Sequence, residues 1–288
     1  MQEPPQSTKR SVLELFKLDG RVALVTGGAG LLGAGFCRSL AQAGAAVMAA
    51  DINAAAAEDL AKAIVESGYR VSAVEVDVTN PASVQRMVEA ALETYGRLDI
   101  LVNSAALDPK FDPHHQTAAL HRPGTGAFED FPFEAWNQAL AVNLTGAYLC
   151  CQAAVAPMLA QGSGVIINLS SIYGLAGPDQ RLYQRAEAGA PPQYKPVYYS
   201  VTKAGILGLT RYLATYYAGK NIRVNALTPG GVYNGHDESF VQAYSARAVL
   251  GRMAEKDEMN GALLFLASDA SAYMTGANLV VDGGWTAW

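Results

Sequence analysis

Short apolar runs recur along this chain, separated by longer stretches in which apolar residues follow a helical period. Runs of this length, bounded by turn residues, are typical of strands buried on both faces of a sheet. The predicted strands are Val22–Thr26, Ala46–Ala50, Val71–Val76, Ile100–Asn103, Val165–Leu169, Arg223–Leu227 and Asn278–Val281. The predicted helices are Leu31–Ala43, Ala54–Ser67, Pro81–Tyr95, Phe133–Ala160, Tyr198–Tyr217 and Lys256–Ala267. This alternation predicts an α/β protein with a doubly wound parallel sheet in a single domain.

Two segments interrupt the alternation. Residues 107–130 hold three of the four histidines, and residues 178–196 hold four prolines together with Arg181, Arg185 and Lys195. Long loops without regular structure are usually functional or disordered. Both follow predicted strands at their carboxyl ends, where doubly wound sheets bind ligands. We therefore expect these insertions to wall a substrate pocket, with Arg181 or Arg185 in direct contact with substrate. A surface insertion or an oligomer contact is the alternative.

Composition narrows the class of protein. The chain has 288 residues, half of them apolar, and a net charge of −5. No strongly basic patch stands out, so nucleic acid is not expected as a partner. Residues 1–17 form a polar extension without the apolar core of a signal peptide, and no uninterrupted apolar run reaches membrane-spanning length. We expect a cytoplasmic protein without a membrane partner, whose domain spans residues 18–288. Cys37, Cys150 and Cys151 indicate no disulfide framework.

A glycine-rich turn, TGGAGLLG at Thr26–Gly33, directly follows the first predicted strand and opens a helix. Gly28, Gly30 and Gly33 spell G-x-G-x-x-G, which permits a tight turn, close approach to a pyrophosphate and close helix–strand packing. The helix N-terminus offers free N–H donors to phosphate. This context predicts a dinucleotide on a Rossmann fold. The predicted contacts from this turn are Gly27, Gly28, Gly30, Leu31, Leu32 and Gly33.

Acidic residues follow the next two strands. Asp51 lies 18 residues after Gly33, where a carboxylate can accept hydrogen bonds from a ribose 2′-OH and repel a 2′-phosphate, so NAD is predicted rather than NADP. Alternatively, Asp51 or Asn53 caps the following helix, which is compatible with ribose binding. Asp77 could accept from the adenine amino group or be a solvated turn residue. The remaining predicted cofactor contacts are Val78, Asn103, Ala105, Pro229, Gly230 and Val232.

Candidate chemistry lies in Tyr199 and Lys203, which share one face of a predicted helix because they are four residues apart. Tyrosine alone has a pKa of about 10, and a nearby ammonium favours the phenolate. Ser171, at the end of a buried strand, could hold the oxygen of a carbonyl or alcohol. Together with the glycine turn, these residues indicate hydride transfer. A chance pairing on an amphipathic helix is the alternative for Tyr199 and Lys203 taken by themselves.

The order of these motifs resembles that of the classical short-chain dehydrogenase/reductases over nearly the whole chain. The resemblance is carried by Thr26–Gly33, Asp77, Asn103–Ala106, Asn143, Ser171, Tyr199, Lys203 and Pro229-Gly230. It implies that Tyr199 is the general acid or base. It also implies that Lys203 lowers the pKa of Tyr199 and binds the nicotinamide ribose. Ser171 would bond the substrate oxygen, and Asn143 would order a water in a proton relay.

Neighbouring residues are distinguished by their context. Ser171 is preferred to Ser170 because a glycine follows three positions later, at Gly174, as in the family. Tyr199 is preferred to Tyr198 because only Tyr199 has a lysine four residues later.

Two features depart from the family pattern. Leu31 occupies the second-last glycine position, which gives the spacing T-G-x-x-G-x-x-G of the extended branch of the family. The separation of 28 positions between Ser171 and Tyr199 is about twice the usual one, and the 178–196 insertion accounts for the excess. This insertion leaves the substrate undetermined.

We therefore predict an NAD(H)-dependent oxidoreductase that interconverts a secondary alcohol and a ketone on a polar small molecule, such as a sugar derivative. One alternative is a sugar-nucleotide epimerase or dehydratase with recycled NAD, although little chain follows Val281–Gly284 to form that branch's substrate domain. The other is a dinucleotide-sensing protein without activity, although such proteins usually lose the catalytic Tyr or Lys.

Two further expectations concern metal and assembly. His114, His115 and His121 lack a ligand spacing, so no metal is expected. The helix Tyr198–Tyr217 is apolar on more than one face, as in a helix that covers the sheet and also a partner subunit. We expect a homodimer or homotetramer, as is common in the family.

Overall fold

The computed structural model describes residues 10–108, 127–183 and 193–288. Seven strands form one sheet in the order β3-β2-β1-β4-β5-β6-β7, and every neighbouring pair is parallel. The strands are β1 Val22–Thr26, β2 Ala46–Asp51, β3 Val71–Glu75, β4 Ile100–Asn103, β5 Gly164–Leu169, β6 Ile222–Pro229 and β7 Asn278–Val281. The predicted doubly wound α/β fold in a single domain is confirmed, and each predicted strand is present within two residues of its expected bounds.

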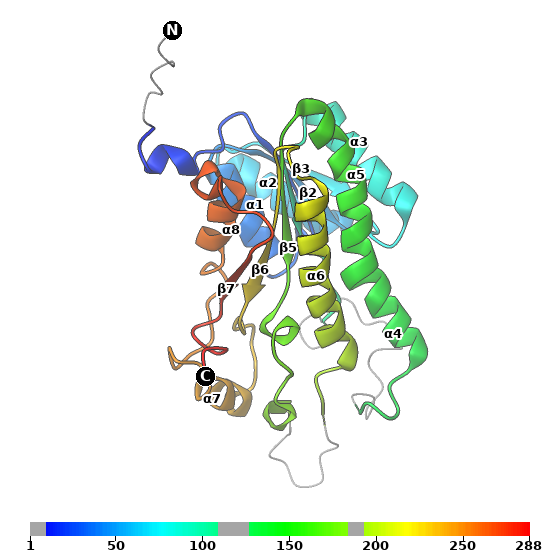
Figure 1. Ribbon diagram of the computed structural model, residues 1–288, viewed down its shortest axis with the longest axis vertical. Coiled ribbons are helices and arrows are strands. Elements are labelled where there is room, and N and C mark those ends of the chain that lie inside the picture. The colour runs from blue at the N-terminus through cyan, green and yellow to red at the C-terminus, as the bar shows by residue number, and fades with distance from the viewer. Residues whose placement is uncertain (1–9, 109–126, 184–192) are drawn as a thin grey trace.

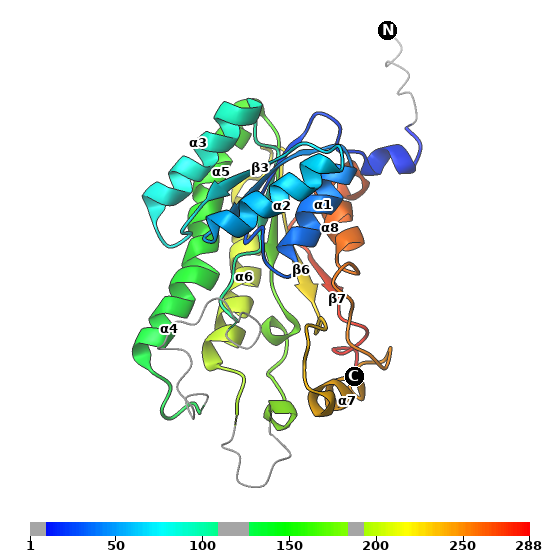
Figure 2. The same cartoon turned by 180° about the vertical axis from the view of Figure 1, so that it is seen from behind.

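Helices cover both faces of this sheet (Figures 1 and 2). Helices α1, α2 and α8 lie on one face, and α3, α5 and α6 lie on the other. Helices α4 and α7 lie beyond the carboxyl end of the sheet. The helices are α1 Gly33–Gln42, α2 Ala54–Glu66, α3 Pro81–Tyr95, α4 Phe133–Leu140, α5 Gly146–Gln161, α6 Val197–Tyr216, α7 Glu238–Ser245 and α8 Asn260–Ala267.

The continuous apolar runs of the strands follow from this two-sided burial. In β1, Ala23 and Val25 pack into the core beneath α1 and α8. Leu24, between them, packs into the other core with α3 and α5. Successive side chains of a strand point to opposite faces, so both parities must be apolar when helices cover both faces. The two cores therefore require the hydrophobic pattern seen in the sequence.

The predicted helix Phe133–Ala160 is divided in the structure. Helix α4 ends at Leu140, a π-helical turn spans Ala141–Thr145, and α5 continues from Gly146. By length and composition, one helical stretch of the described chain, Phe133–Gln161, could cross a membrane. Its buried residues, among them Cys150 and Ala154, pack against strand residues in the core. The stretch therefore packs as a helix of a protein interior.

The carboxyl ends of β1 and β4 meet where the strand order reverses, and this point positions the ligand site. The hydroxyl of Thr26 accepts hydrogen bonds from the backbone N–H groups of Ser104 (3.2 Å) and Ala105 (3.4 Å), which ties the two strand ends together.

The assembly of the protein is a separate question. The homodimer or homotetramer expected from the sequence stays a prediction.

A methyl group at Gly33 would destabilise the first strand–helix turn. A Cβ there would lie 2.0 Å from the carbonyl oxygen of Gly27, and backbone cannot yield as a flexible side chain can. We expect Gly33→Ala to lower the free energy of unfolding by about 1–3 kcal/mol, the usual cost of overpacking. Urea titration would measure this decrease in the free energy of unfolding. Gly261→Ala is the matched control, because an added Cβ in α8 meets nothing within 4 Å. Equal stability of the two variants would contradict the steric argument.

Candidate active site

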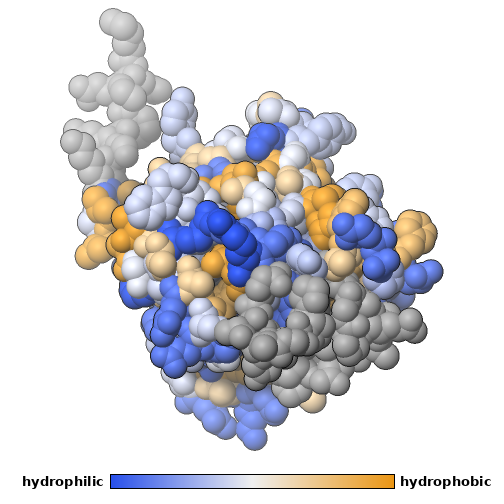
Figure 3. Space-filling model, turned by 90° about the horizontal axis from the view of Figure 1, so that it is seen from below, coloured by the Kyte–Doolittle hydropathy of each residue, from blue (hydrophilic) through white to orange (hydrophobic). Residues whose placement is uncertain are grey.

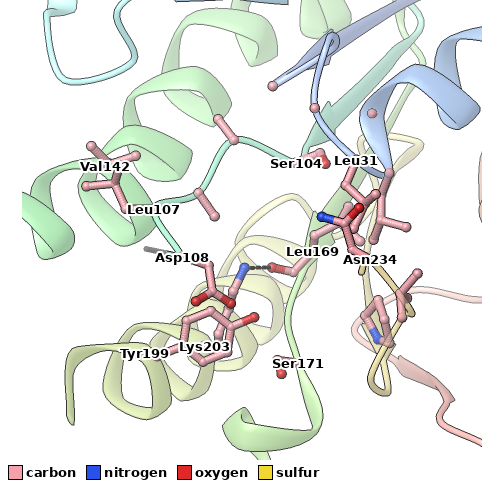
Figure 4. A pocket seen from close by; sticks show the side chains of 18 of the residues that line it. Leu31, Ser104, Leu107, Asp108, Val142, Leu169, Ser171, Tyr199, Lys203 and Asn234 are labelled. Carbon is pink, nitrogen blue, oxygen red and sulfur yellow. Dashed lines mark hydrogen bonds between the residues drawn. The ribbon is translucent and has the colours of Figure 1, made fainter. Parts of the chain in front are cut away.

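A cavity of about 610 Å³ opens at the carboxyl end of the sheet. Its walls come from the ends of β2, β5 and β6 and from the segments that follow each of the strands β1 to β6. Figure 3 looks onto this end of the molecule, where hydrophobic and hydrophilic residues adjoin. Figure 4 shows side chains from these separate elements converging on one space.

The glycine turn forms one end of the cavity and fits a dinucleotide. Gly27 has a φ of +62°, and a Cβ on it would lie 2.8 Å from the Cα of Ala105. Gly27, Gly30, Leu31, Leu32 and Gly33 all line the cavity, as predicted. Gly28 does not. It packs on β2 instead, where a Cβ would lie 3.1 Å from the Cα of Ala49. The turn thus presents backbone to the cavity at the start of α1, as phosphate binding requires.

Leu31 departs from the classical glycine pattern without closing this turn. Its side chain lines the cavity and is drawn at the edge of the space in Figure 4. The close approaches that demand glycine fall at Gly27 and Gly33. The extended-type spacing thus stays an observation on the sequence.

Asp51 lies at the end of β2 and faces the cavity while almost fully buried. Its carboxylate accepts hydrogen bonds from the backbone N–H groups of Ala29 and Asn53, each at 3.0 Å. The cap of α2 is Asn53, whose side chain accepts from the N–H of Ala56. Because a carboxylate has about four acceptor sites, Asp51 keeps capacity for a ribose hydroxyl.

The other predicted cofactor residues divide into two groups. Those that line the cavity are Asp77, Val78, Ala105, Pro229, Gly230 and Val232. Asp77 accepts from the N–H and hydroxyl of Thr79 through one oxygen. Asn103 does not line the cavity; its amide lies in the core and donates to Asn168 Oδ1 (2.8 Å). The residues that follow it, Ser104 and Ala105, line the cavity, and a cofactor contact of Asn103 itself stays a prediction.

Helix α6 brings Tyr199 and Lys203 to the cavity opposite Ser171, as Figure 4 shows. The Lys203 ammonium lies 5.7 Å from the centre of the Tyr199 ring and donates to the carbonyl of Leu169 at the end of β5 (2.9 Å). Ser171 follows β5 and accepts from the N–H of Tyr173 (3.2 Å). The predicted Ser–Tyr–Lys grouping is therefore assembled around one space.

Asn143 is placed differently from these three residues. It lies in the π-helical turn, almost fully buried, and does not line the cavity. Its side chain exchanges two hydrogen bonds with the backbone of Leu107, accepting from the N–H (2.6 Å) and donating to the carbonyl (3.2 Å). Asn143 thus fixes the chain just after β4. A role in a proton relay stays a prediction.

The electrostatics of Tyr199 differ from the sequence-based expectation. Burial raises the pKa of its phenol above the ordinary value, the charge of Asp108 raises it further, and the Ser171 hydroxyl opposes both. Burial also lowers the pKa of Lys203 from 10.5 to about 8. At neutral pH Lys203 still carries its charge, but burial and the carboxylate of Asp108 outweigh the support that this charge gives the phenolate. The net effect is a protonated Tyr199 at neutral pH.

Of the two substrate contacts predicted in the 178–196 insertion, the structure describes one, and a substrate contact there stays a prediction. Arg181 has an 86% exposed side chain, pairs with Asp179 (2.7 Å) and does not line the cavity. Arg185 lies outside the described residues, as do His114, His115 and His121. Among the residues that the structure describes, no group of His, Cys, Asp and Glu could hold a metal ion. Among the described residues of this insertion, Lys195 is the basic side chain that lines the cavity.

Sequence reasoning missed two features of the cavity. Lys195 pairs with Asp108 across it (2.7 Å), although the sequence separates the two by 87 positions. The second is an aromatic wall, which we define as Tyr173, Tyr183, Phe240 and Tyr244. Phe240 and Tyr244 lie on α7, which was not predicted. Asp237 caps this helix by accepting from the N–H of Phe240 (2.8 Å), and that capping pattern was the available signal.

Known proteins resemble this chain over nearly its full length. A family model described as enoyl-(acyl carrier protein) reductase matches residues 28–286. A cis-4-hydroxycyclohexanecarboxylate dehydrogenase from Sinomonas cyclohexanicum is 38% identical over 93% of this chain and 97% of its own. A D-threitol dehydrogenase from Mycolicibacterium smegmatis is 36% identical over 98% of both chains. The crystal structure of a gluconate 5-dehydrogenase from Burkholderia cenocepacia J2315, in complex with NADP and tartrate, has a TM-score of 0.81 and 30% identity over 96% of this chain and 100% of that chain.

The buried Lys203 should make stability depend on pH. Because the folded protein releases this proton at about pH 8 and an unfolded lysine releases it at about 10.4, the unfolded chain binds more protons between these values. The free energy of unfolding should therefore rise with pH across this window, by about 1 kcal/mol per pH unit relative to Lys203→Met. Urea titrations at several pH values would measure the difference. A difference between wild type and Lys203→Met that stays constant across this pH window would contradict the prediction. Lys220→Met, at an exposed position, is the control and should follow the wild-type curve.

Proposed function

Because this chain belongs to the short-chain dehydrogenase/reductase family, we propose that it is an NAD(H)-dependent oxidoreductase that interconverts a secondary alcohol and a ketone on a polar small molecule. The observation that carries the proposal is the meeting of Tyr199, Lys203 and Ser171 in the cavity that the glycine turn opens. A bound nicotinamide would accept or supply the hydride there.

Tyr199 is the residue suited to move the proton. Its raised pKa keeps the phenol protonated at neutral pH, the form that donates to a ketone oxygen during reduction. In the direction of alcohol oxidation the phenolate is required, so this rate should increase with pH. Ser171 lies on the cavity wall near the phenol and is suited to hold the same substrate oxygen by a second hydrogen bond.

Lys203 and Asp51 would hold the two ends of the cofactor. Lys203 faces the cavity, and one N–H of its ammonium donates to the carbonyl of Leu169. The other N–H groups can therefore donate to a ribose hydroxyl. Asp51 supports the preference for NAD, since its carboxylate would accept from the adenosine ribose and repel a 2′-phosphate. The structural relative from Burkholderia cenocepacia contains NADP, which makes this preference the point to test.

The cavity also bears on the substrate. The aromatic wall offers flat apolar surface beside Tyr199, while the Asp108–Lys195 pair offers a carboxylate and an ammonium. A compact substrate with several hydroxyl groups, either a ring or a short polyol, would match both surfaces. The two relatives named above are a dehydrogenase for a hydroxylated ring acid and one for a short polyol, which supports the same substrate class.

Tyr199→Phe should abolish turnover and leave cofactor affinity nearly unchanged. A general acid–base group contributes about 10²–10⁴-fold, so kcat should fall at least about 100-fold. Turnover would be assayed with NAD⁺ and a panel of cyclohexane-1,2-diol, threitol and gluconate, and NADH binding by fluorescence. Tyr198→Phe is the matched control, because that buried hydroxyl has no hydrogen-bond partner among the residues that the structure describes and does not line the cavity. Activity of Tyr199→Phe within about tenfold of wild type would rule out the assignment.

Asp51 should set the cofactor preference. We expect wild type to bind NADH at least about tenfold more tightly than NADPH, and Asp51→Asn to remove most of this difference by removing the charge. Fluorescence titration with both cofactors gives the ratio. Asp77→Asn, the loss of another cavity carboxylate, should change both affinities alike and keep the ratio. Equal affinities in wild type would mean that Asp51 serves only the backbone groups that it already binds.

A further inference from the structure

A second lysine lies against the candidate catalytic tyrosine. The Lys195 ammonium is 4.0 Å from the centre of the Tyr199 ring, closer than the ammonium of Lys203 at 5.7 Å. Lys195 is 3% exposed, although a lysine is rarely buried without a partner. Both carboxylate oxygens of Asp108 accept from this ammonium, at 2.9 and 2.7 Å. The pair therefore brings one positive and one negative charge to the phenol.

Both members of the pair are held by backbone contacts. Asp108 directly follows Leu107, whose N–H and carbonyl are bound by the Asn143 amide. The backbone of Lys195 is bound in the same two-bond manner by the Gln180 side chain, with donation from the Lys195 N–H (2.8 Å) and acceptance by its carbonyl (3.2 Å). Pro196, the next residue, is the N-cap of α6. The charges are thus fixed relative to the helix that carries Tyr199.

Other groups face Tyr199 from the elements packed around it. They are Lys203 and Tyr198 of α6, Tyr173 and Ser171 after β5, Tyr183 in the 178–196 insertion, Tyr244 of α7 and Asp108 after β4. The tyrosines are neutral at ordinary pH because burial raises the pKa of each phenol. Within the described part of the chain, the charges near Tyr199 are therefore those of Asp108, Lys195 and Lys203.

We propose that Asp108 and Lys195 are positioning residues that set the proton affinity of Tyr199 through two opposing charges. Lys195 stabilises the phenolate from the face of the ring, as a cation does over an aromatic ring. Asp108 holds the ammonium there and at the same time favours the neutral phenol. This inference rests on the proposed role of Tyr199 as the proton-transfer group. It assigns to the inserted segment an electrostatic task at the reacting tyrosine.

The two charges make opposite predictions, which a purely structural pair does not. Asp108→Asn leaves the ammonium and removes the carboxylate, so the pKa of Tyr199 should fall. Lys195→Met leaves the carboxylate, so this pKa should rise. Lys203 would shift in the same direction in each case, so the signs hold whichever group is observed. A charge at this range shifts a pKa by about one unit or more, which changes the phenolate-to-phenol ratio about tenfold.

The ionisation of Tyr199 can be read without any substrate. Ultraviolet difference spectra of the full-length chain, each variant minus the same variant carrying Tyr199→Phe, report the phenolate of this one tyrosine. At about pH 10, the ordinary pKa of tyrosine, Asp108→Asn should show about tenfold more phenolate than wild type. Lys195→Met should show less, and Lys195→Arg should match wild type. Arg252→Met, which breaks an exposed ion pair outside the cavity, is the control and should not shift it.

The same variants are then compared by their pH dependence of kcat with NAD⁺ and the panel alcohol that turns over fastest. The apparent pKa should fall in Asp108→Asn and rise in Lys195→Met. Unchanged Tyr199 phenolate in Asp108→Asn, a shift of the same sign in both single variants, or an increase in KM alone would each overturn the inference. If Tyr199→Phe keeps its activity, the proposed function fails, whereas the difference spectra still decide what Asp108 and Lys195 do to the phenol.

Discussion

The contact between the end of β5 and helix α6 determines where the active-site groups lie. The Lys203 ammonium donates to the carbonyl of Leu169, and the hydroxyl of Ser170 donates to the carbonyl of Lys203 (2.8 Å). A Cβ at Gly174 would lie 2.7 Å from the same Lys203 carbonyl, so the two segments touch at backbone level. Ser171 can face Tyr199 only because this joint holds strand and helix at that distance.

Behind the cavity, a chain of buried side-chain hydrogen bonds also connects β5 to α6, and it extends to β4. Asn103 of β4 donates to Asn168 of β5, which donates to Thr210 of α6 (3.0 Å). Three elements that contribute to the cavity are thereby linked by side chains that never reach it. A shift of any member would break at least one of these buried hydrogen bonds, so the network favours one arrangement of the three elements. The Asn103 side chain is thus part of the core between these elements.

The fold was predictable because strands that are buried on both faces, such as β1 and β5, have continuous apolar runs in the sequence. The grouping of Ser171, Tyr199 and Lys203 was predictable for a related reason: each lies at a strand end or at a helical spacing. The Asp108–Lys195 pair could not be predicted from the residues next to either partner, since the two lie in different insertions, 87 positions apart. The sequence could not show where the Arg181 side chain points, because its position at the surface depends on the ion pair with Asp179. The π-helical turn at Asn143 was not predicted either, because the sequence around it is part of one continuous apolar stretch.

The hydrogen bonds of Asp51 have a thermodynamic consequence. Both carboxylate oxygens already accept backbone N–H groups, from Ala29 and from Asn53, so one side-chain conformation is selected in the folded chain. The rotational entropy of this side chain is therefore lost during folding. A ribose that binds here meets an acceptor that is already oriented, and little further ordering is required of it. Since ordering a side chain at an interface costs about 0.5–1.5 kcal/mol, this arrangement favours affinity without a single additional contact.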